Sequence, residues 1–156
     1  MDGKEATVDF APRKGRFLLN LVIGGILLGW SAGAHGQKTE ESSAPAIKQY
    51  RDAVAFQNRG VYDLAADEWK KFLTDFAKDP LAGKAQHYLA ICQLQQKQIP
   101  DAIASFQKAL KDFPASDITE QTYLNLGLAQ FSLAQDGKSE AYDQAAKTFK
   151  TLLDKY

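Results

Sequence analysis

The chain has 156 residues, with 19 basic and 19 acidic side chains, one cysteine and two histidines. Its length suits one domain, and its balanced charge gives no reason to expect a nucleic acid or another polyanion as a partner. The lone cysteine excludes an intrachain disulfide and a cysteine-based zinc site, and nothing in the composition points to a cofactor.

The N-terminal segment has the pattern of a secretory signal peptide. A basic stretch, 13–16, precedes an uncharged apolar run, 17–30, and the small residues Ala34 and Gly36 follow at the spacing of a cleavage site. A membrane span needs roughly 20 apolar residues, and this run is shorter. We therefore predict that residues 1–36 are a signal peptide.

Export to the periplasm is the localisation that this pattern predicts, and a lone cysteine is compatible with that compartment. The alternative is that 17–30 is retained as an uncleaved anchor, which would hold the protein on the membrane facing the periplasm. The polar stretch that follows, 37–45, is predicted to be a disordered tether without a role in the core.

From residue 46 onward the apolar residues have the helical period, and the pattern repeats. The stretch 62–76 superposes on 99–113, and 142–156 is a third copy. In each copy a small residue is followed by an aromatic one four positions later and a leucine four further on, all on one helix face. The residues predicted to pack between helices are Ala65, Trp69, Leu89, Ala90, Ala102, Phe106, Ala109, Pro114, Gly127, Ala145 and Phe149.

A single pair of helices cannot cover such an apolar face, whereas stacked pairs can. The predicted fold is therefore all-α, a solenoid of about three antiparallel helix-turn-helix repeats within 46–156, at about 46–80, 83–116 and 120–156. Relative to the middle repeat, the segment 132–141 is predicted to lengthen the last turn. The helix that ends at Tyr156 is expected to leave apolar side chains partly uncovered.

The run 89–114, LAICQLQQKQIPDAIASFQKALKDFP, resembles a tetratricopeptide repeat. It has the family's leucine and small residue in a first helix, an alanine and an aromatic residue in a second, and a closing proline. Over 62–117 the chain is similar to the exported tetratricopeptide proteins of the bacterial cell envelope, of the Tol-Pal-associated cell-division coordinator and outer-membrane assembly lipoprotein type. This resemblance implies binding of a protein or peptide partner, an envelope protein, without catalysis.

In this family the first helices of successive repeats line a concave groove that can hold a peptide or a partner's helix. By position, the resemblance implies that some of the following residues contact a partner and that others pack between repeats. They are Tyr50, Val54, Gln57, Lys84, His87, Ile91, Leu94, Gln121, Leu124, Leu128 and Phe131.

No set of residues indicates catalysis or metal binding. His87 has no companion at ligand spacing, and Cys92 is expected to be a small buried apolar residue. Two functions stay open: an exported adaptor that binds a partner, and a structural spacer of repeats in the N-terminal part of a longer membrane-anchored repeat protein.

Overall fold

The computed structural model describes residues 41–156, and within this range it contains six helices and no strand. The all-α prediction is therefore confirmed. The predicted signal peptide and most of the predicted tether lie outside the described residues. The helices are α1 (Ala44–Asn58), α2 (Tyr62–Asp75), α3 (Ala82–Gln95), α4 (Ile99–Asp112), α5 (Thr119–Gln135) and α6 (Ala141–Lys155).

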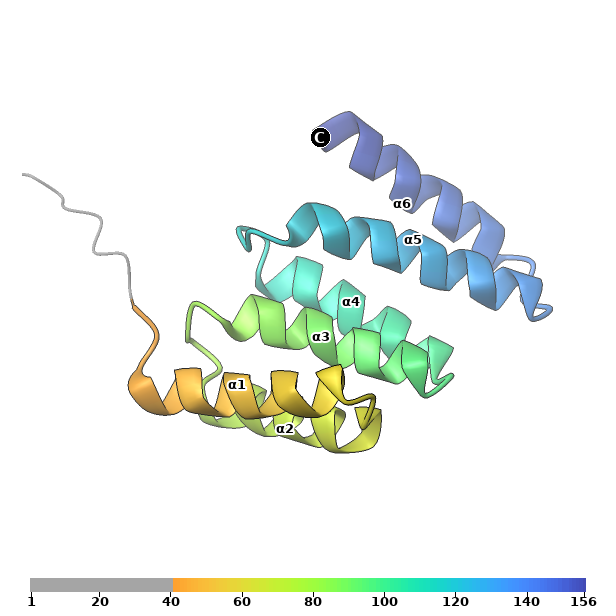
Figure 1. Cartoon of the computed structure of the whole chain (residues 1–156). Helices are drawn as coiled ribbons and strands as arrows, with labels where there is room; N and C mark the ends of the chain where they lie inside the picture. The colour runs from red at the N-terminus through yellow and green to blue at the C-terminus, as the bar shows by residue number, and fades with distance from the viewer. Residues whose placement is uncertain (1–40) are drawn as a thin grey trace, which may run out of the picture. The chain divides into compact units, whose positions relative to one another are not determined.

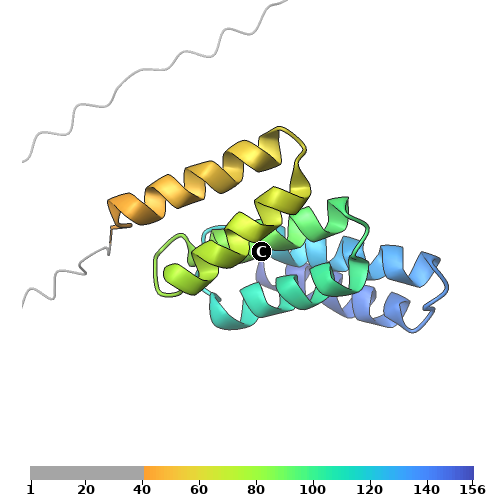
Figure 2. The ribbon, with the colours of Figure 1, turned by 90° about the horizontal axis from the view of Figure 1, so that it is seen from below.

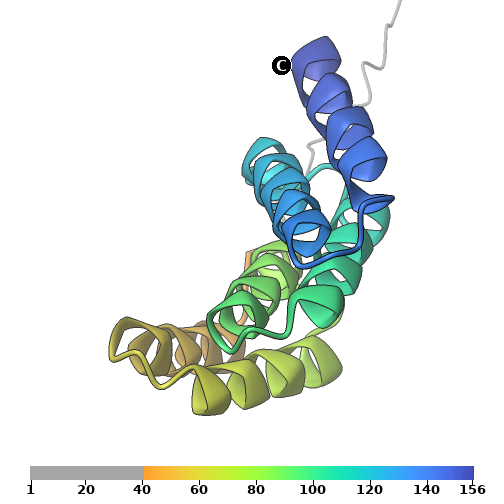
Figure 3. The same cartoon turned by 90° about the vertical axis from the view of Figure 1, so that its right-hand side faces the viewer.

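The helices pack as three antiparallel pairs stacked in chain order, the arrangement of a tetratricopeptide-like solenoid (Figure 1). From the side, α1, α3 and α5 form one layer and α2, α4 and α6 the other (Figure 3). The view from below looks onto the α1–α2 pair (Figure 2). Among residues 41–156, no helix is long and apolar enough to cross a membrane.

The first helix begins earlier than the sequence pattern predicted. Ser43 is its N-cap, and the Ser43 hydroxyl accepts a hydrogen bond from the backbone N–H of Ala46 at 3.3 Å. Pro45 lies in the first turn, where its missing N–H is not needed. Residues 44 and 45 therefore belong to α1 and not to the predicted tether.

The extra residues of the last repeat are shared between helix and turn. α5 has 17 residues against 14 in the equivalent α3. The connection between α5 and α6, 136–140, is also longer than the connection between α3 and α4, 96–98. The predicted lengthening of the last turn is therefore only part of the difference, because residues 133–135 continue the helical period of α5. Gly137 does lie in the turn, at a positive φ of 97°.

Most of the residues predicted to pack between helices are buried, and the small residues lie where helices approach closely. A Cβ on Gly127 would lie only 2.5 Å from the ring of Phe149, so α5 needs glycine there to seat that ring. Phe149 packs on Gly127, although its side chain is half-buried. One predicted packing residue differs: Pro114 is exposed after α4, where it ends the helix and fills no space between repeats.

Candidate partner-binding surface

Nine of the eleven predicted groove residues, all except Lys84 and Gln121, fall into three equivalent sets, one on each helix of the α1–α3–α5 layer, separated by 37 positions in the sequence. The first two sets lie at the joints between consecutive repeats. The first set is Tyr50, Val54 and Gln57, the second is His87, Ile91 and Leu94, and the third is Leu124, Leu128 and Phe131.

The first set is half-buried at the joint between the first two repeats. The ring of Tyr50 lies edge-on to Trp69, with 4.9 Å between ring centroids. The Gln57 side-chain oxygen accepts a hydrogen bond from the indole N–H of Trp69 at 3.0 Å. Burial, followed by the proximity of Tyr88 and Asp117, raises the pKa of Tyr50 to about 12. Tyr50 is therefore a neutral phenol at this joint.

The second set is covered by α5, and His87 is 2 % exposed. The Thr122 hydroxyl donates to the Ile118 carbonyl at 2.8 Å, so its oxygen accepts from His87 Nδ1–H, also at 2.8 Å. The other ring nitrogen faces the Asn125 amide at 3.5 Å and can only accept. Burial lowers the pKa of His87 to about 4.

His87 is thus a neutral, fully enclosed packing residue, and this corrects the prediction that it could contact a partner in a groove. Ile91 and Leu94 are half-buried against an apolar cluster that includes Leu126 and Ala129 of α5. The first and second sets therefore belong chiefly to the packing between repeats.

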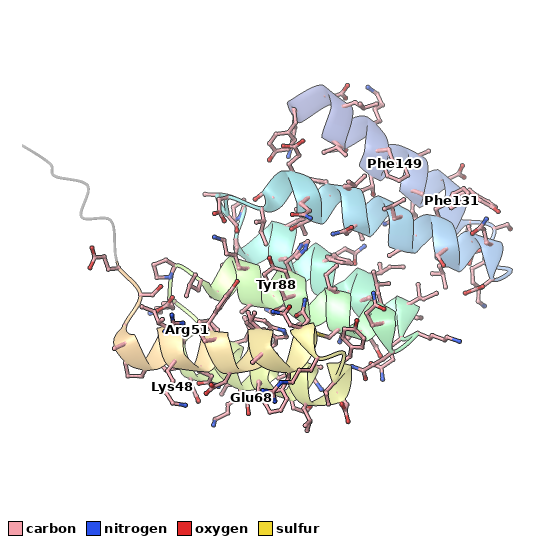
Figure 4. All side chains as sticks on the ribbon, in the orientation of Figure 1. Lys48, Arg51, Glu68, Tyr88, Phe131 and Phe149 are labelled. Carbon is pink, nitrogen blue, oxygen red and sulfur yellow. The ribbon has the colours of Figure 1, made fainter. Side chains whose placement is uncertain are left out.

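The third set is exposed, because none of the described helices lies over it. The exposed fractions are 43 % for Leu124, 51 % for Leu128 and 43 % for Phe131. Phe131, labelled in Figure 4, lies edge-on to Tyr142 at the start of α6, with 5.5 Å between ring centroids. Leu124, Leu128, Phe131 and Tyr142 together form what we call the C-terminal face.

A shallow pocket of about 340 Å³ adjoins this face, between the start of α5 and the end of α6. Its apolar part comes from Ile118, Leu124 and Leu152, and its rim carries the carboxylates of Asp117 and Glu120. Lys84 forms an ion pair with Asp117 at 2.7 Å. Glu120 is the second acidic group on the rim. The predicted residue Gln121 also lines this pocket and is exposed.

The α1–α2 end of the array has a different surface. A second pocket of about 330 Å³ there is lined mostly by polar and charged residues. On α1, Lys48 and Asp52 form an exposed ion pair at 2.7 Å (Figure 4). The lining residues of this pocket are Asp52, Ala55, Phe56, Arg59 and Glu68.

The remaining reactive side chain is inert. Cys92 is fully buried, as predicted, and burial raises the pKa of its thiol to about 11. The thiol lies 3.5 Å from the Gln57 side-chain oxygen, to which it donates. In the described part of the chain no group of three or more histidine, cysteine or carboxylate side chains could hold a metal ion.

Sequence reasoning missed Tyr142 as part of an exposed surface, although the signal was present. Tyr142 begins the third copy of the repeated pattern as Tyr62 begins the first. Tyr62 is half-buried, and Tyr142 is 44 % exposed. The sequence pattern therefore predicted the position of Tyr142 in the repeat. Its exposure depends on which helices pack around it.

Comparison with known protein families supports this fold for the middle repeat. A family model, described as the tetratricopeptide repeat, matches residues 84–116, which include nearly all of α3 and the whole of α4. No curated protein matches the chain. Tetratricopeptide repeats generally mediate binding between proteins, so the match indicates a protein-binding scaffold.

Proposed function

We propose that this protein is an exported, non-catalytic scaffold that binds a protein or peptide partner in the bacterial cell envelope. The observation that carries the proposal is the C-terminal face, where three apolar side chains of one helix stay exposed in a solenoid whose residues 84–116 match the tetratricopeptide repeat. Large apolar side chains gathered on one face are typical of an interaction site.

The face is large enough to contribute to binding. Complete burial of a leucine or phenylalanine side chain stabilises by about 1.5–3 kcal/mol. Leu124, Leu128 and Phe131 are already about half covered, so a partner that covers them fully gains about half of that amount from each. One partner can cover these neighbouring side chains together, so their burial free energies add. Exposed leucines that lie apart cannot be covered together in this way.

The states of His87 and Cys92 support the absence of catalysis in this proposal. His87 is enclosed and neutral, and Cys92 is buried with a raised pKa. A general base must reach the proton that it removes, and a reactive thiol must be accessible as thiolate. Neither condition holds for these two side chains.

The proposed location rests on the N-terminal sequence and on the resemblance to the Tol-Pal-associated and outer-membrane assembly proteins. Mass spectrometry of the protein purified from its native host tests it. We expect a mature N-terminus within a few residues of Gln37. A membrane-bound chain that retains residues 1–36 would instead indicate an N-terminal anchor.

Photo-cross-linking in the native host tests the binding function. A photoreactive amino acid replaces Leu128 in the full chain, and Leu64 of α2, which is 45 % exposed, is the matched control. We expect a covalent adduct with another protein from position 128 and none from position 64. If neither position gives an adduct, the alternative of a structural spacer is favoured.

A further inference from the structure

The two joints inside the array show what kind of helix covers a face of this type. The residues of α3 and α5 that face the preceding repeat have one spacing, i, i+3, i+7 and i+10, and one composition: small, small, leucine, small. In α3 they are Ala82, Ala85, Leu89 and Cys92. In α5 they are Thr122, Leu126 and Ala129, and the first position is Thr119, whose hydroxyl donates to the carbonyls of Pro114 and Ser116.

All eight of these side chains are buried, with at most 8 % exposed. The small residues let the helix approach the preceding pair closely, and the leucine fills the space between the two helices beneath it. We call this pattern the docking stripe. Both internal joints contain a docking stripe. The docking stripe is therefore the surface that is complementary to a helix pair of this chain.

Leu124, Leu128 and Phe131 occupy the repeat positions of His87, Ile91 and Leu94, which the docking stripe of α5 covers. The C-terminal face therefore continues the internal joints of the array. Resting on the proposed scaffold function, we propose that this face binds an amphipathic helix of a partner protein that carries a docking stripe. The helix is seated as the first helix of a further repeat.

A second copy of this chain cannot supply that helix from its α1 end. The positions of α1 equivalent to the docking stripe are Pro45, Lys48, Asp52 and Ala55. Lys48 and Asp52 form an ion pair in water, and its burial in an apolar joint costs several kcal/mol for each ion. Head-to-tail stacking of two copies is therefore disfavoured.

The face also specifies details of the helix that it accepts. The second small residue of the stripe is Thr122 where it meets His87, and Ala85 in the α3 stripe that packs beside Tyr50. Leu124 offers no hydrogen-bonding group, so alanine fits better than threonine opposite it. Asp117 beside the pocket is already paired with Lys84, and the carboxylate of Glu120 favours a basic residue near the start of the partner's helix.

Fluorescence anisotropy with a labelled peptide tests the proposal on the full chain. The probe copies residues 79–97 of this chain, with Cys92→Ala to remove the thiol and with Ile91→Gln and Leu94→Lys to make its opposite face polar. A control peptide adds Ala85→Glu in the docking stripe. We expect saturable binding of the probe and at least tenfold weaker binding of the control peptide.

Two variants of the chain locate the site. Leu128→Lys is expected to weaken probe binding at least tenfold, and Leu64→Lys, on the outer helix α2, is expected to leave it unchanged. Equal melting temperatures of both variants and the parent chain show that each is folded. Equal binding to both variants, or no saturable binding to the parent, would overturn the proposal.

Two other occupants have their own signatures. Dimerisation in light scattering that Leu128→Lys abolishes, without probe binding, would assign the face to a second copy. A reading frame that continues past codon 156 into a helix with a docking stripe would show that the face is covered within one chain. Either result overturns the partner's helix. An adduct from position 128 without probe binding would refute only the stripe and leave the scaffold function standing.

Discussion

The two outer faces of the six-helix array are built on the same repeat but have opposite surfaces. The α1 face carries Lys48 and Asp52 where an internal joint has alanine and leucine, and both are exposed to water. The C-terminal face carries exposed leucine and phenylalanine, and Leu153 of α6 is 81 % exposed. Position in the repeat thus determines where a side chain points, and the choice of residue determines whether the face accepts a helix.

The strongest test of this comparison converts the α1 face into a docking stripe. The double variant Lys48→Ala with Asp52→Leu copies Ala85 and Leu89 of α3. Loss of the exposed ion pair costs only about 0.3–0.5 kcal/mol, so the fold should persist. We expect head-to-tail assembly, with the altered α1 of one copy on the C-terminal face of the next, measured by light scattering across concentration.

The matched control for that variant is Lys108→Ala with Asp112→Leu, which removes an ion pair of the same spacing from the outer helix α4. It should stay at the parent's mass. Assembly of both double variants to the same extent would mean that added hydrophobicity alone causes association. It would contradict the conclusion that the residues of the α1 face prevent helix docking there.

The covered joint predicts a pH effect that the open face lacks. The pKa of His87 is about 4 in the fold and 6.5 in the unfolded chain, because burial disfavours the charged ring. The unfolded state therefore binds the proton first as pH falls. The contribution of His87 to stability is complete above pH 6.5 and is lost by about 3 kcal/mol as pH falls to 4.

Urea unfolding at a series of pH values measures this loss, and His87→Gln separates it from the titration of the carboxylates. The parent should lose more stability than His87→Gln between pH 6.5 and 4. Parallel curves for the two proteins would show that the ring is not enclosed as described.

The packing within the array predicts a smaller effect. Ala102 is fully buried between helices, whereas Ala104, two residues along α4, is exposed. Ala102→Leu should destabilise by about 1–3 kcal/mol through overpacking, and Ala104→Leu should be nearly neutral. Thermal unfolding of the two variants decides the matter, and identical melting curves would contradict the repeat register.

The smallest effect is expected at the open face. Leu128→Lys should change the free energy of unfolding by no more than about 0.5 kcal/mol, because the lysine side chain extends into water. The same substitution at the equivalent covered position, Ile91→Lys, places an ammonium group beside the apolar cluster and should cost more. Denaturant titration compares the two, and equal losses would mean that Leu128 is covered.

The sequence predicted the parts of this fold that depend on local pattern. The spacing of Ala102 and Phe106 located a helix face, and both residues are fully buried. The early start of α1 was readable in Ser43 and Pro45, a capping residue followed by a proline, but the polar composition of 37–45 obscured it. The signal peptide and the envelope location stay predictions.

The candidate site could be predicted only in part, because burial here depends on the next repeat. His87, Ile91 and Leu94 have the same helical spacing as Leu124, Leu128 and Phe131, so the resemblance to the repeat family implied one groove for both sets. Whether a helix covers them is decided by residues far along the chain. The bond between His87 and Thr122, 35 positions apart, has no signature in the local sequence.

The division of the core also has a consequence for how the array opens. One buried cluster joins α1, α2 and α3, a second joins α3, α4 and α5, and α6 contributes a residue to neither. In a linear array each repeat is held by its neighbours, so fraying begins where a neighbour is missing. Backbone amides of α6 should therefore exchange with solvent deuterium fastest, and a helix seated on the C-terminal face would slow that exchange.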